Sequence, residues 1–236
     1  MKTPVKTAGF TLIEVILFLA ISGMMIAGLL ASMAGSVNRE RYEESVSSFN
    51  DYLNGQYNLV DNVRNNRTAV LSGCSGAERG TSDCTIVGRF VVTTDGRTFT
   101  SQPIIAEEAP EFGNTMITEK EQFAQMKLRA INSATDGEQY TLPWQATIVA
   151  PNTQDPPLSF RLAIVRSPLS HSMRTYYAAG ASGTVDETIV AATTTGRQAL
   201  CVRPDGVNTR MLGVTIDQGG VNSSAVQFAT GEICNA

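Results

Sequence analysis

The chain has little charge and almost no histidine. Charged residues make up 17% of its 236 positions, whereas about 25% is usual for a soluble domain, so some stretch must be nearly uncharged. His171 is the only histidine, which excludes a zinc site built from several histidines. The formal net charge of -4 argues against a basic module that binds nucleic acid through many phosphate contacts. The length suits one sizeable core with or without an appendage.

The uncharged stretch lies near the N-terminus. Residues 10–37 contain one charge, Glu14, and residues 15–37 contain none. At 1.5 Å per residue such a helix crosses the roughly 30 Å hydrocarbon core of a bilayer, so we predict a membrane span. A cleaved secretory signal, cut near Ser32-Met33-Ala34, and a buried soluble helix are the alternatives. Lysine and arginine nearly balance on the two sides of the stretch, so charge alone does not orient it.

Glu14 is an ionisable residue at the edge of the predicted span, where a carboxylate is functional by default. No lysine or arginine lies within one helical turn of it. If the chain were cut after Gly9, the new α-amino group of Phe10 would be a candidate cation. That amine is better placed to meet Glu14 of a neighbouring chain than its own.

The segment Gly9-Phe10-Thr11-Leu12-Ile13-Glu14-Val15, behind a short basic leader, resembles the class III signal of type IV prepilins and type II secretion pseudopilins. The resemblance covers residues 2–15 and implies that a membrane peptidase removes leader 1–9 and methylates Phe10. It also implies that Glu14 meets the N-terminal amine of an adjacent subunit, and that the leader faces the cytoplasm while the C-terminal part is exported.

Ala31 stands where many major pilins have a helix-breaking proline, which would kink the helix. The chain is in this respect more similar to minor pilins and pseudopilins, and we expect a straighter helix. Small residues also recur every fourth position, at Gly23, Ala27, Ala31 and Gly35. This ridge permits close helix approach in lipid, although such residues are common in membrane helices in any case.

An amphipathic pattern follows the membrane segment. Apolar residues alternate at spacings of four and three, and Gln56 alone interrupts them. The residues concerned are Tyr42, Val46, Phe49, Leu53, Val60 and Val63. We therefore predict one continuous helix over 10–66, of which 10–37 spans the membrane, and expect the C-terminal region to cover the apolar stripe.

Residues 67–236 predict an exported, antiparallel β-rich head, and the whole chain an α+β fold. Asp95-Gly96 between segments 85–94 and 97–105 is a strong hairpin signal. Thr118 and Glu121 form a capping box at the start of a helix expected to run to residue 132. Strands are predicted at 144–150, 160–166, 174–178, 188–194, 198–203, 210–216 and 225–230.

The four cysteines, Cys74, Cys84, Cys201 and Cys234, allow three pairings. Short loops favour Cys74 with Cys84 and Cys201 with Cys234, and an exported compartment permits both bonds. Free thiols or a zinc site are the alternatives. No C-x-x-C spacing is present, which disfavours zinc.

No catalytic residue, metal or cofactor is predicted. His171 is a lone histidine in a polar segment, and the chain lacks a nucleophile elbow and a phosphate-binding glycine loop. Several arginines in the strand-rich part would suit a DNA-binding pilin if they shared one face. They are Arg161, Arg166, Arg174, Arg197, Arg203 and Arg210.

The sequence therefore predicts a membrane-anchored filament subunit that is not an enzyme. By resemblance, its partners are other pilin subunits, the prepilin peptidase, an assembly platform protein and its ATPase, with the membrane before assembly and a cell-surface or periplasmic filament afterwards. Adhesion, motility, DNA uptake and secretion are the roles open to it, with DNA or a surface ligand as partner of the head. The alternative is an exported binding domain released by signal peptidase.

Overall fold

The structure is a computed structural model that describes residues 11–62, 85–107, 118–131, 137–151, 156–167, 171–192, 196–204, 211–218, 226–229 and 231–234. The chain divides into two compact units, Met1–Arg41 and Tyr42–Ala236. The first consists, where described, of the beginning of helix α1. The second contains the end of α1 and all the strands of the described residues.

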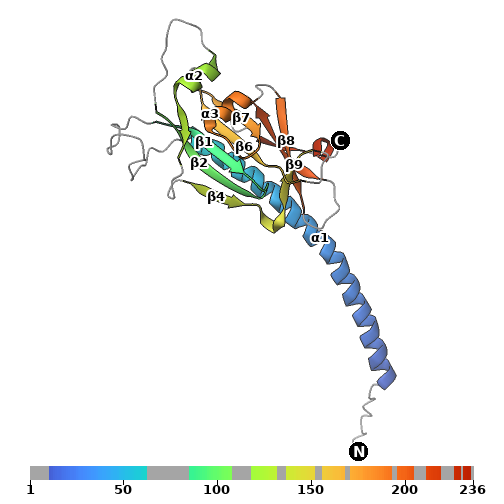
Figure 1. Cartoon of the computed structure of the whole chain (residues 1–236). Helices are drawn as coiled ribbons and strands as arrows, with labels where there is room; N and C mark the ends of the chain where they lie inside the picture. Colours follow the sequence, from blue (N-terminus) through green and yellow to red (C-terminus); the bar gives the residue numbers. More distant parts are fainter. Residues whose placement is uncertain are drawn as a thin grey trace, which may run out of the picture. The chain divides into compact units, whose positions relative to one another are not determined.

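The described part of the chain is a mixture of helices and antiparallel strands (Figure 1). The helices are α1 (Leu12–Asp61), α2 (Glu119–Gln125), α3 (Val185–Ala191) and α4 (Gly231–Cys234), with a 3-10 turn, η1, at Pro143–Gln145. The strands are β1 (Thr85–Thr93), β2 (Thr98–Ala106), β3 (Leu128–Ala130), β4 (Glu138–Thr141), β5 (Thr147–Val149), β6 (Phe160–Arg166), β7 (Met173–Ala179), β8 (Gly196–Arg203), β9 (Leu212–Gln218) and β10 (Val226–Ala229).

The strands form two sheets, and every pairing in them is antiparallel. One sheet has the order β3-β2-β1-β6-β7, with β4 also paired to β2; the other has the order β10-β9-β8-β5. Strands β7 and β9 lie beside each other and bring the two sheets together. The predicted α+β fold with an antiparallel head is confirmed.

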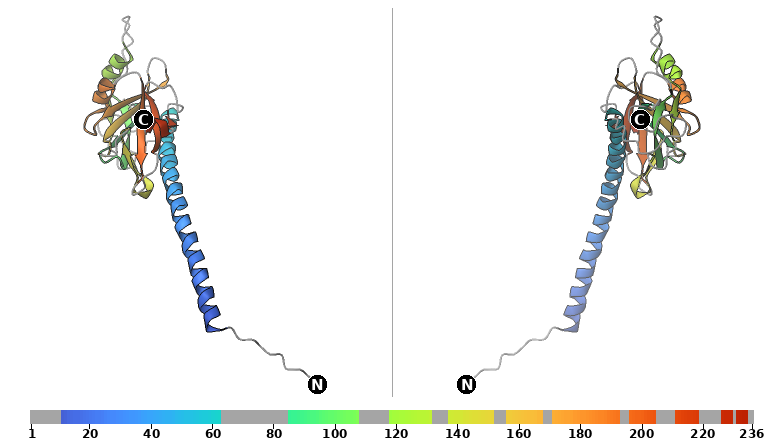
Figure 2. Two further views of the ribbon diagram at one scale, coloured as in Figure 1. Left: turned by 90° about the vertical axis from the view of Figure 1, so that its right-hand side faces the viewer. Right: turned by 90° about the vertical axis from the view of Figure 1, so that its left-hand side faces the viewer.

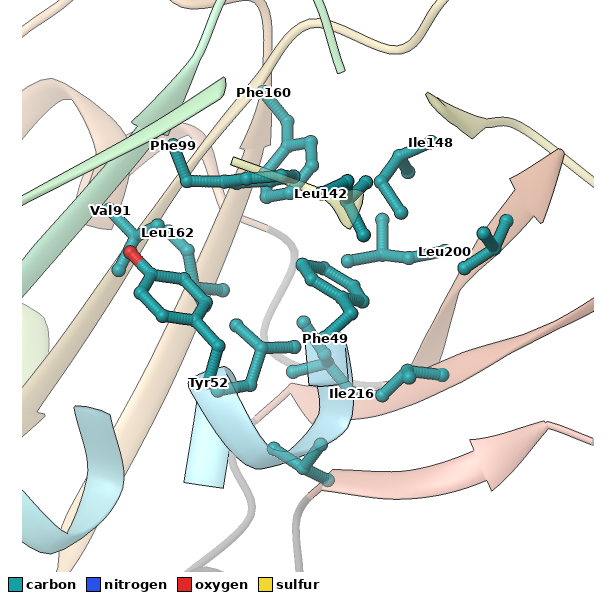
Figure 3. Packing of buried hydrophobic residues seen from close by; sticks show 14 of the residues in the cluster. Phe49, Tyr52, Val91, Phe99, Leu142, Ile148, Phe160, Leu162, Leu200 and Ile216 are labelled. Atoms are coloured by element: carbon teal, nitrogen blue, oxygen red, sulfur yellow. The ribbon is translucent and has the colours of Figure 1, made fainter. Parts of the chain in front are cut away.

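The second half of α1 lies against both sheets and supplies the centre of the core. Phe49 and Leu53 are fully buried, and Figure 3 shows Phe49 and Tyr52 directed at residues of both sheets. Side chains of the helix and of the two sheets form one buried cluster. From α1 it includes Tyr42, Val46, Phe49, Tyr52, Leu53, Tyr57 and Val60; from the sheets, Val91, Phe99, Phe160, Leu162, Ile164, Leu200, Val202, Val214, Ile216 and Val226.

Short helices cover the opposite faces of the sheets. Phe123 of α2 and Val185 and Ile189 of α3 pack on the first sheet, on the side away from α1 (Figure 2). Cys234 of α4 packs with Cys201 on the second sheet. The first sheet is therefore covered on both faces around β6, which explains why β6 is buried along almost its whole length.

The Asp95-Gly96 hairpin is confirmed. Asp95 Oδ1 accepts hydrogen bonds from the backbone amides of Arg97 (2.9 Å) and Thr98 (2.7 Å). Gly96 has φ of 64°, and a Cβ placed there would lie 2.6 Å from the carbonyl oxygen of Ile148. Glycine is required at this position because a neighbouring backbone approaches too closely for any side chain.

Gln56 interrupts the apolar pattern of α1 because it belongs to a polar cluster between α1 and the first sheet. Gln56 Oε1 accepts a hydrogen bond from Arg89 Nε (3.1 Å), and its Nε2 donates to Glu138 Oε2 (3.1 Å). Arg89 also donates to Ser101 Oγ (2.9 Å). Gln56 is only 1% exposed, so the cluster satisfies polar atoms that burial would otherwise leave unpaired.

The predicted helix from Thr118 to residue 132 is too long. The capping box is present, but α2 ends at Gln125. Lys127 has φ of 47°, and Leu128–Ala130 pairs with β2 instead. Pairing with a sheet edge and burial of Leu128 outweigh the helical spacing of the apolar residues.

The strand predicted at 188–194 is wrong, since residues 185–191 form α3. Thr184 and Glu187 make a second capping box, and Val185, Thr188 and Ile189 are buried on one helical face. The strand predicted at 144–150 is shorter than expected because it begins, after η1, at Thr147. The other predicted strands are present, and the predicted helix over 10–66 is described as α1 over Leu12–Asp61.

The polar cluster yields a stability prediction. Replacing Gln56→Ala removes its hydrogen bonds to Arg89 and Glu138, and disrupting buried polar partners costs about 1–3 kcal/mol. We expect a lower urea midpoint for the full chain in detergent. Asn58→Ala, at an exposed position of the same helix, is the matched control. Equal midpoints for the two variants would show that the cluster contributes nothing.

The tyrosines yield a second prediction, because burial raises the pKa of all six in the chain: Tyr42, Tyr52, Tyr57, Tyr140, Tyr176 and Tyr177. For Tyr176 the pKa rises to about 12. Raised phenol pKa values stabilise the fold fully below the unfolded value of about 10, and this contribution is lost as pH rises above it.

We therefore expect phenolate absorbance to appear together with alkaline unfolding. Near pH 10, the native chain would show no increase in phenolate absorbance, whereas the same chain in denaturant would titrate there. A smooth native titration at the denatured pKa, with circular dichroism unchanged, would contradict the described burial.

Candidate functional site

The first unit presents an apolar surface along α1. Leu12–Leu30 is long and apolar enough to cross a membrane, and none of this segment is buried inside the structure. Phe18 is 70% exposed and Met24 79%. In water, each such side chain forgoes about 1.5–3 kcal/mol of burial, so an apolar environment would stabilise this surface.

Thr11 and Glu14 form a capping box at the start of α1. Glu14 Oε2 accepts hydrogen bonds from the backbone amide of Thr11 (2.9 Å) and from its hydroxyl (2.9 Å). The Glu14 amide donates to Thr11 Oγ1 (3.4 Å). The carboxylate thus provides an acceptor for the Thr11 amide and hydroxyl at the helix N-terminus. Its negative charge also interacts favourably with the positive end of the helix dipole.

This partner of Glu14 was missed from the sequence, although the signal for it was present. Thr11 precedes Glu14 by three residues, the same Thr-x-x-Glu spacing found at Thr118 and Thr184. The resemblance to prepilins implies only an assembly role for Glu14. Glu14 therefore has a local structural role in addition to the predicted intermolecular one.

The other predicted positions along α1 are only partly described. Gly9 and Phe10 lie outside the described residues. Gly23 has open space around it, with no atom within 4 Å of an added Cβ, and Ala27 is exposed. The side chains of Ala31 and Gly35 lie outside the described part, so half of the predicted ridge is seen on an open helix surface.

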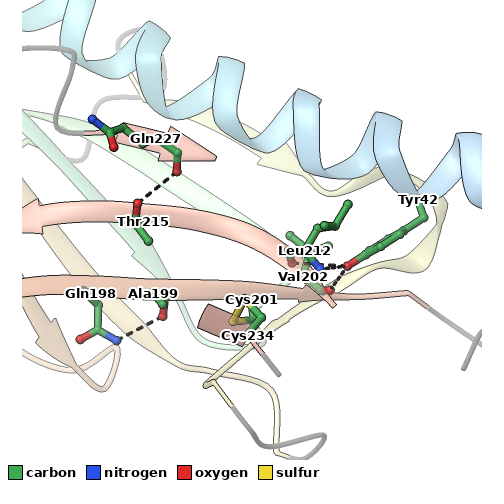
Figure 4. The surroundings of a disulfide bond; sticks show 9 residues. All are labelled: Tyr42, Gln198, Ala199, Cys201, Val202, Leu212, Thr215, Gln227 and Cys234. Carbon is green, nitrogen blue, oxygen red and sulfur yellow. Dashed lines mark hydrogen bonds between the residues drawn. A yellow bond between two sulfur atoms is a disulfide. The ribbon is translucent and has the colours of Figure 1, made fainter. Parts of the chain in front are cut away.

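A disulfide and a tyrosine fasten the second unit (Figure 4). Cys201 of β8 is bonded to Cys234 of α4, which confirms one of the two favoured pairs. Cys74 and Cys84 lie outside the described residues. Tyr42 Oη donates to the carbonyl of Val202 (2.8 Å) and accepts from the amide of Leu212, which attaches α1 to β8 and β9.

Three of the arginines considered for DNA binding have partners within the chain. Arg161 is 8% exposed, and donates to Thr188 Oγ1 (2.7 Å) and Gly180 O (3.1 Å). Arg166 pairs with Asp61 (3.0 Å), and Arg174 with Glu119 (3.0 Å). Arg210 lies outside the described residues. Phosphate binding by the first three would have to displace intramolecular partners.

A hollow of about 440 Å³ opens between β3 and the segment that leads into α3. Glu107 on its wall is paired with Arg129 (2.7 Å). Burial raises the pKa of Asp186, and a hydrogen bond from the Leu128 amide opposes this effect. Thr184 on the wall caps α3. These polar groups of the wall therefore take part in holding the fold together.

His171 and the adjacent acidic residues Asp186 and Glu187 belong to the second unit. His171 is exposed in the turn between β6 and β7, with φ of 53°. Its backbone amide donates to Ser167 O (3.0 Å). Asp186 and Glu187 lie in the first turn of α3.

No protein family, no curated protein and no solved structure matches the chain.

Proposed function

We propose that the chain is a structural subunit of a type IV pilus or a related pseudopilus filament, held in the membrane by α1 before assembly. One observation carries the proposal: α1 is a single helix whose two parts meet different environments. Its first 19 residues, Leu12–Leu30, are exposed and apolar, while its last turns are the centre of a β-rich head. The first part needs lipid or the helices of neighbouring copies.

The sequence around the start of α1 supports the same proposal. Gly9-Phe10 immediately precedes the capping residue Thr11, so cleavage between them would leave the helix with a single residue before its cap. The new amine would be a cation close to the Glu14 carboxylate of the same or an adjacent subunit. In this scheme the leader remains in the cytoplasm, and the head is exported on the far side of a single membrane span.

The finer assignment follows from the same features. The absence of proline from residues 10–66 favours a minor pilin or pseudopilin over a major pilin. The subunit would carry out no chemistry of its own. A prepilin peptidase, a platform protein and an ATPase would process and assemble it, and the disulfide of the second unit suits an exported compartment.

Intact-protein mass spectrometry of the membrane fraction tests the proposal. We expect a mature chain that begins at Phe10 and carries one extra methyl group, and the same chain in sheared filaments. A mature chain that begins near Gly35 would identify a secreted domain released by signal peptidase. An uncut chain starting at Met1 would also contradict the proposal.

Two substitutions separate the roles of Glu14. Glu14→Gln removes the charge, but its side-chain carbonyl still accepts from Thr11, because glutamine serves in a capping box. We expect the variant to stay in the membrane and to be cleaved, but to be lost from sheared filaments. Thr11→Val, which weakens the cap and keeps the carboxylate, is the matched control and should assemble. The assembly role of the carboxylate is wrong if Glu14→Gln enters filaments normally, whatever Thr11→Val does.

A further inference from the structure

Strand β4 (Glu138–Thr141) is attached to the head by few apolar contacts. Among the described strands it pairs with β2 alone, and it lies at the border of the first sheet (Figure 1). Three of its four residues are exposed, and Tyr140 is half-buried. Strand β5 is even shorter, yet two of its residues are buried, and Ile148 makes backbone hydrogen bonds to Gly96 and Leu158. β4 therefore contributes little to the apolar core.

Polar contacts and one aromatic pair hold β4 to α1. Gln56 Nε2 donates to Glu138 Oε2 (3.1 Å), and Tyr140 Oη donates to Ser48 Oγ (2.8 Å). The ring of Tyr140 is stacked on that of Tyr52, with the centroids 4.3 Å apart. Exposed hydrogen bonds and few buried apolar contacts are typical of segments that open without unfolding of the whole domain.

We call the surface that β4 covers the β4 seat. It consists of the edge of β2 at Thr98–Ser101, the side chains of Gln56 and Arg89, and the ring of Tyr52. The Arg89 side chain is only 11% exposed, and its Nη2 lies 4.0 Å from Glu138 Oε2. Arg89 also donates to Gln56 Oε1 (3.1 Å) and to Ser101 Oγ (2.9 Å). These two bonds do not involve β4, so they keep the cation in position when β4 leaves.

We propose that the β4 seat is a docking site for an extended segment of a partner protein, and that β4 occupies this site from within the chain. A nearly buried cation whose carboxylate partner lies on a detachable strand offers the same pairing to another carboxylate. The seat lies wholly within the second unit, so docking is independent of how the first unit meets the membrane.

The contacts of β4 define the chemistry of the partner segment. Its main chain pairs with β2, its carboxylate meets Gln56 and Arg89, and its aromatic ring, two positions later, stacks on Tyr52. In strand addition of this kind, main-chain hydrogen bonds give affinity and alternate side chains give specificity. The partner segment is therefore a strand with the pattern carboxylate-x-aromatic.

β4 acts as a built-in competitor for its seat. A tethered strand faces its site at an effective concentration on the order of millimolar, so a free segment binds well only when β4 is detached. The chain can turn away at Leu142, the residue after β4, which is 1% exposed and belongs to the main core. Opening thus moves β4 and leaves the core in place.

Hydrogen exchange of the unmodified full chain in detergent tests the opening. We expect the β4 amides to exchange about a hundredfold or more faster than those of β6, which lies in the interior of the same sheet. Equal rates would show that β4 opens only when the whole head unfolds, and this result would overturn the proposal.

Disulfide trapping in a thiol buffer tests the chemistry of the partner. Thr100→Cys places a thiol on β2 directly opposite Gln139 of β4, and both positions are exposed. Glu138→Ala and Tyr140→Ala in the same chain remove the side-chain contacts of β4. The probe is a peptide with the sequence of residues 137–142 that carries Gln139→Cys. We expect it to be trapped about tenfold more than a peptide in which alanine also replaces the glutamate and the tyrosine.

Arg197→Cys, at an exposed position of β8, is the matched control and should trap both peptides alike. Equal trapping of the two peptides at Thr100→Cys overturns the docking site. If the two alanine substitutions also speed exchange in β6, trapping is repeated with Thr100→Cys alone. The preference for the peptide with carboxylate and ring must then persist at lower yield, and its absence equally overturns the proposal.

Discussion

Burial of the apolar stripe on the second half of α1 is the interaction on which the rest of the head depends. Phe49 and Leu53 are fully buried, and the helix contributes to the same cluster as strands of both sheets. A sheet needs an apolar partner on each buried face. Without this helix, both sheets would present apolar residues to water on the faces that now form the main core.

Polar contacts then fix the position of the helix on the sheets. Tyr42 bonds to β8 and β9 near one end of the packed segment, Gln56 bonds to Arg89 and Glu138 further along, and Arg166 reaches Asp61 at the other end. Apolar packing alone tolerates sliding, whereas these contacts each require one register. Gln56, the polar residue in an otherwise apolar stripe, therefore helps to select one register of the helix on the sheets.

Much of this fold could be predicted from local patterns. The α1 periodicity, the Asp95-Gly96 hairpin and the strand at 160–166 are strong signals, because spacing or turn chemistry allows one structure. The failures come from short elements decided by distant partners. Strand Leu128–Ala130 is held by β2, and Glu138–Thr141 also pairs with β2. The composition of helix α3, with its threonine and alanine residues, is similar to that of the predicted strands, which explains the wrong strand prediction. The capping box of Thr184 and Glu187 is the local signal that indicates a helix start here.

The candidate site was predictable in part. The uncharged stretch identified a helix long and apolar enough to span a membrane, since that property depends on composition and length. The interaction of Glu14 with Thr11 depends on the Thr-x-x-Glu spacing and not on a cation, so charge pairing alone does not predict it. The hydrogen bond from Trp144 Nε1 to Glu44 could not be predicted from the sequence, since the two residues lie 100 positions apart. No local sequence signal predicts the left-handed backbone conformation of Trp144.

The hydrogen bond between Tyr42 and Leu212 also has a consequence for how the chain is made. Its two residues are 170 positions apart, and Val226, later still, belongs to the same core. Because synthesis proceeds from the N-terminus, α1 is made first. The strands that cover its apolar stripe are complete only when nearly the whole chain has been made. The nascent chain therefore passes through a long period in which its central helix has no strands to cover it. During that period the apolar stripe of α1 lacks the two sheets that bury it in the folded chain.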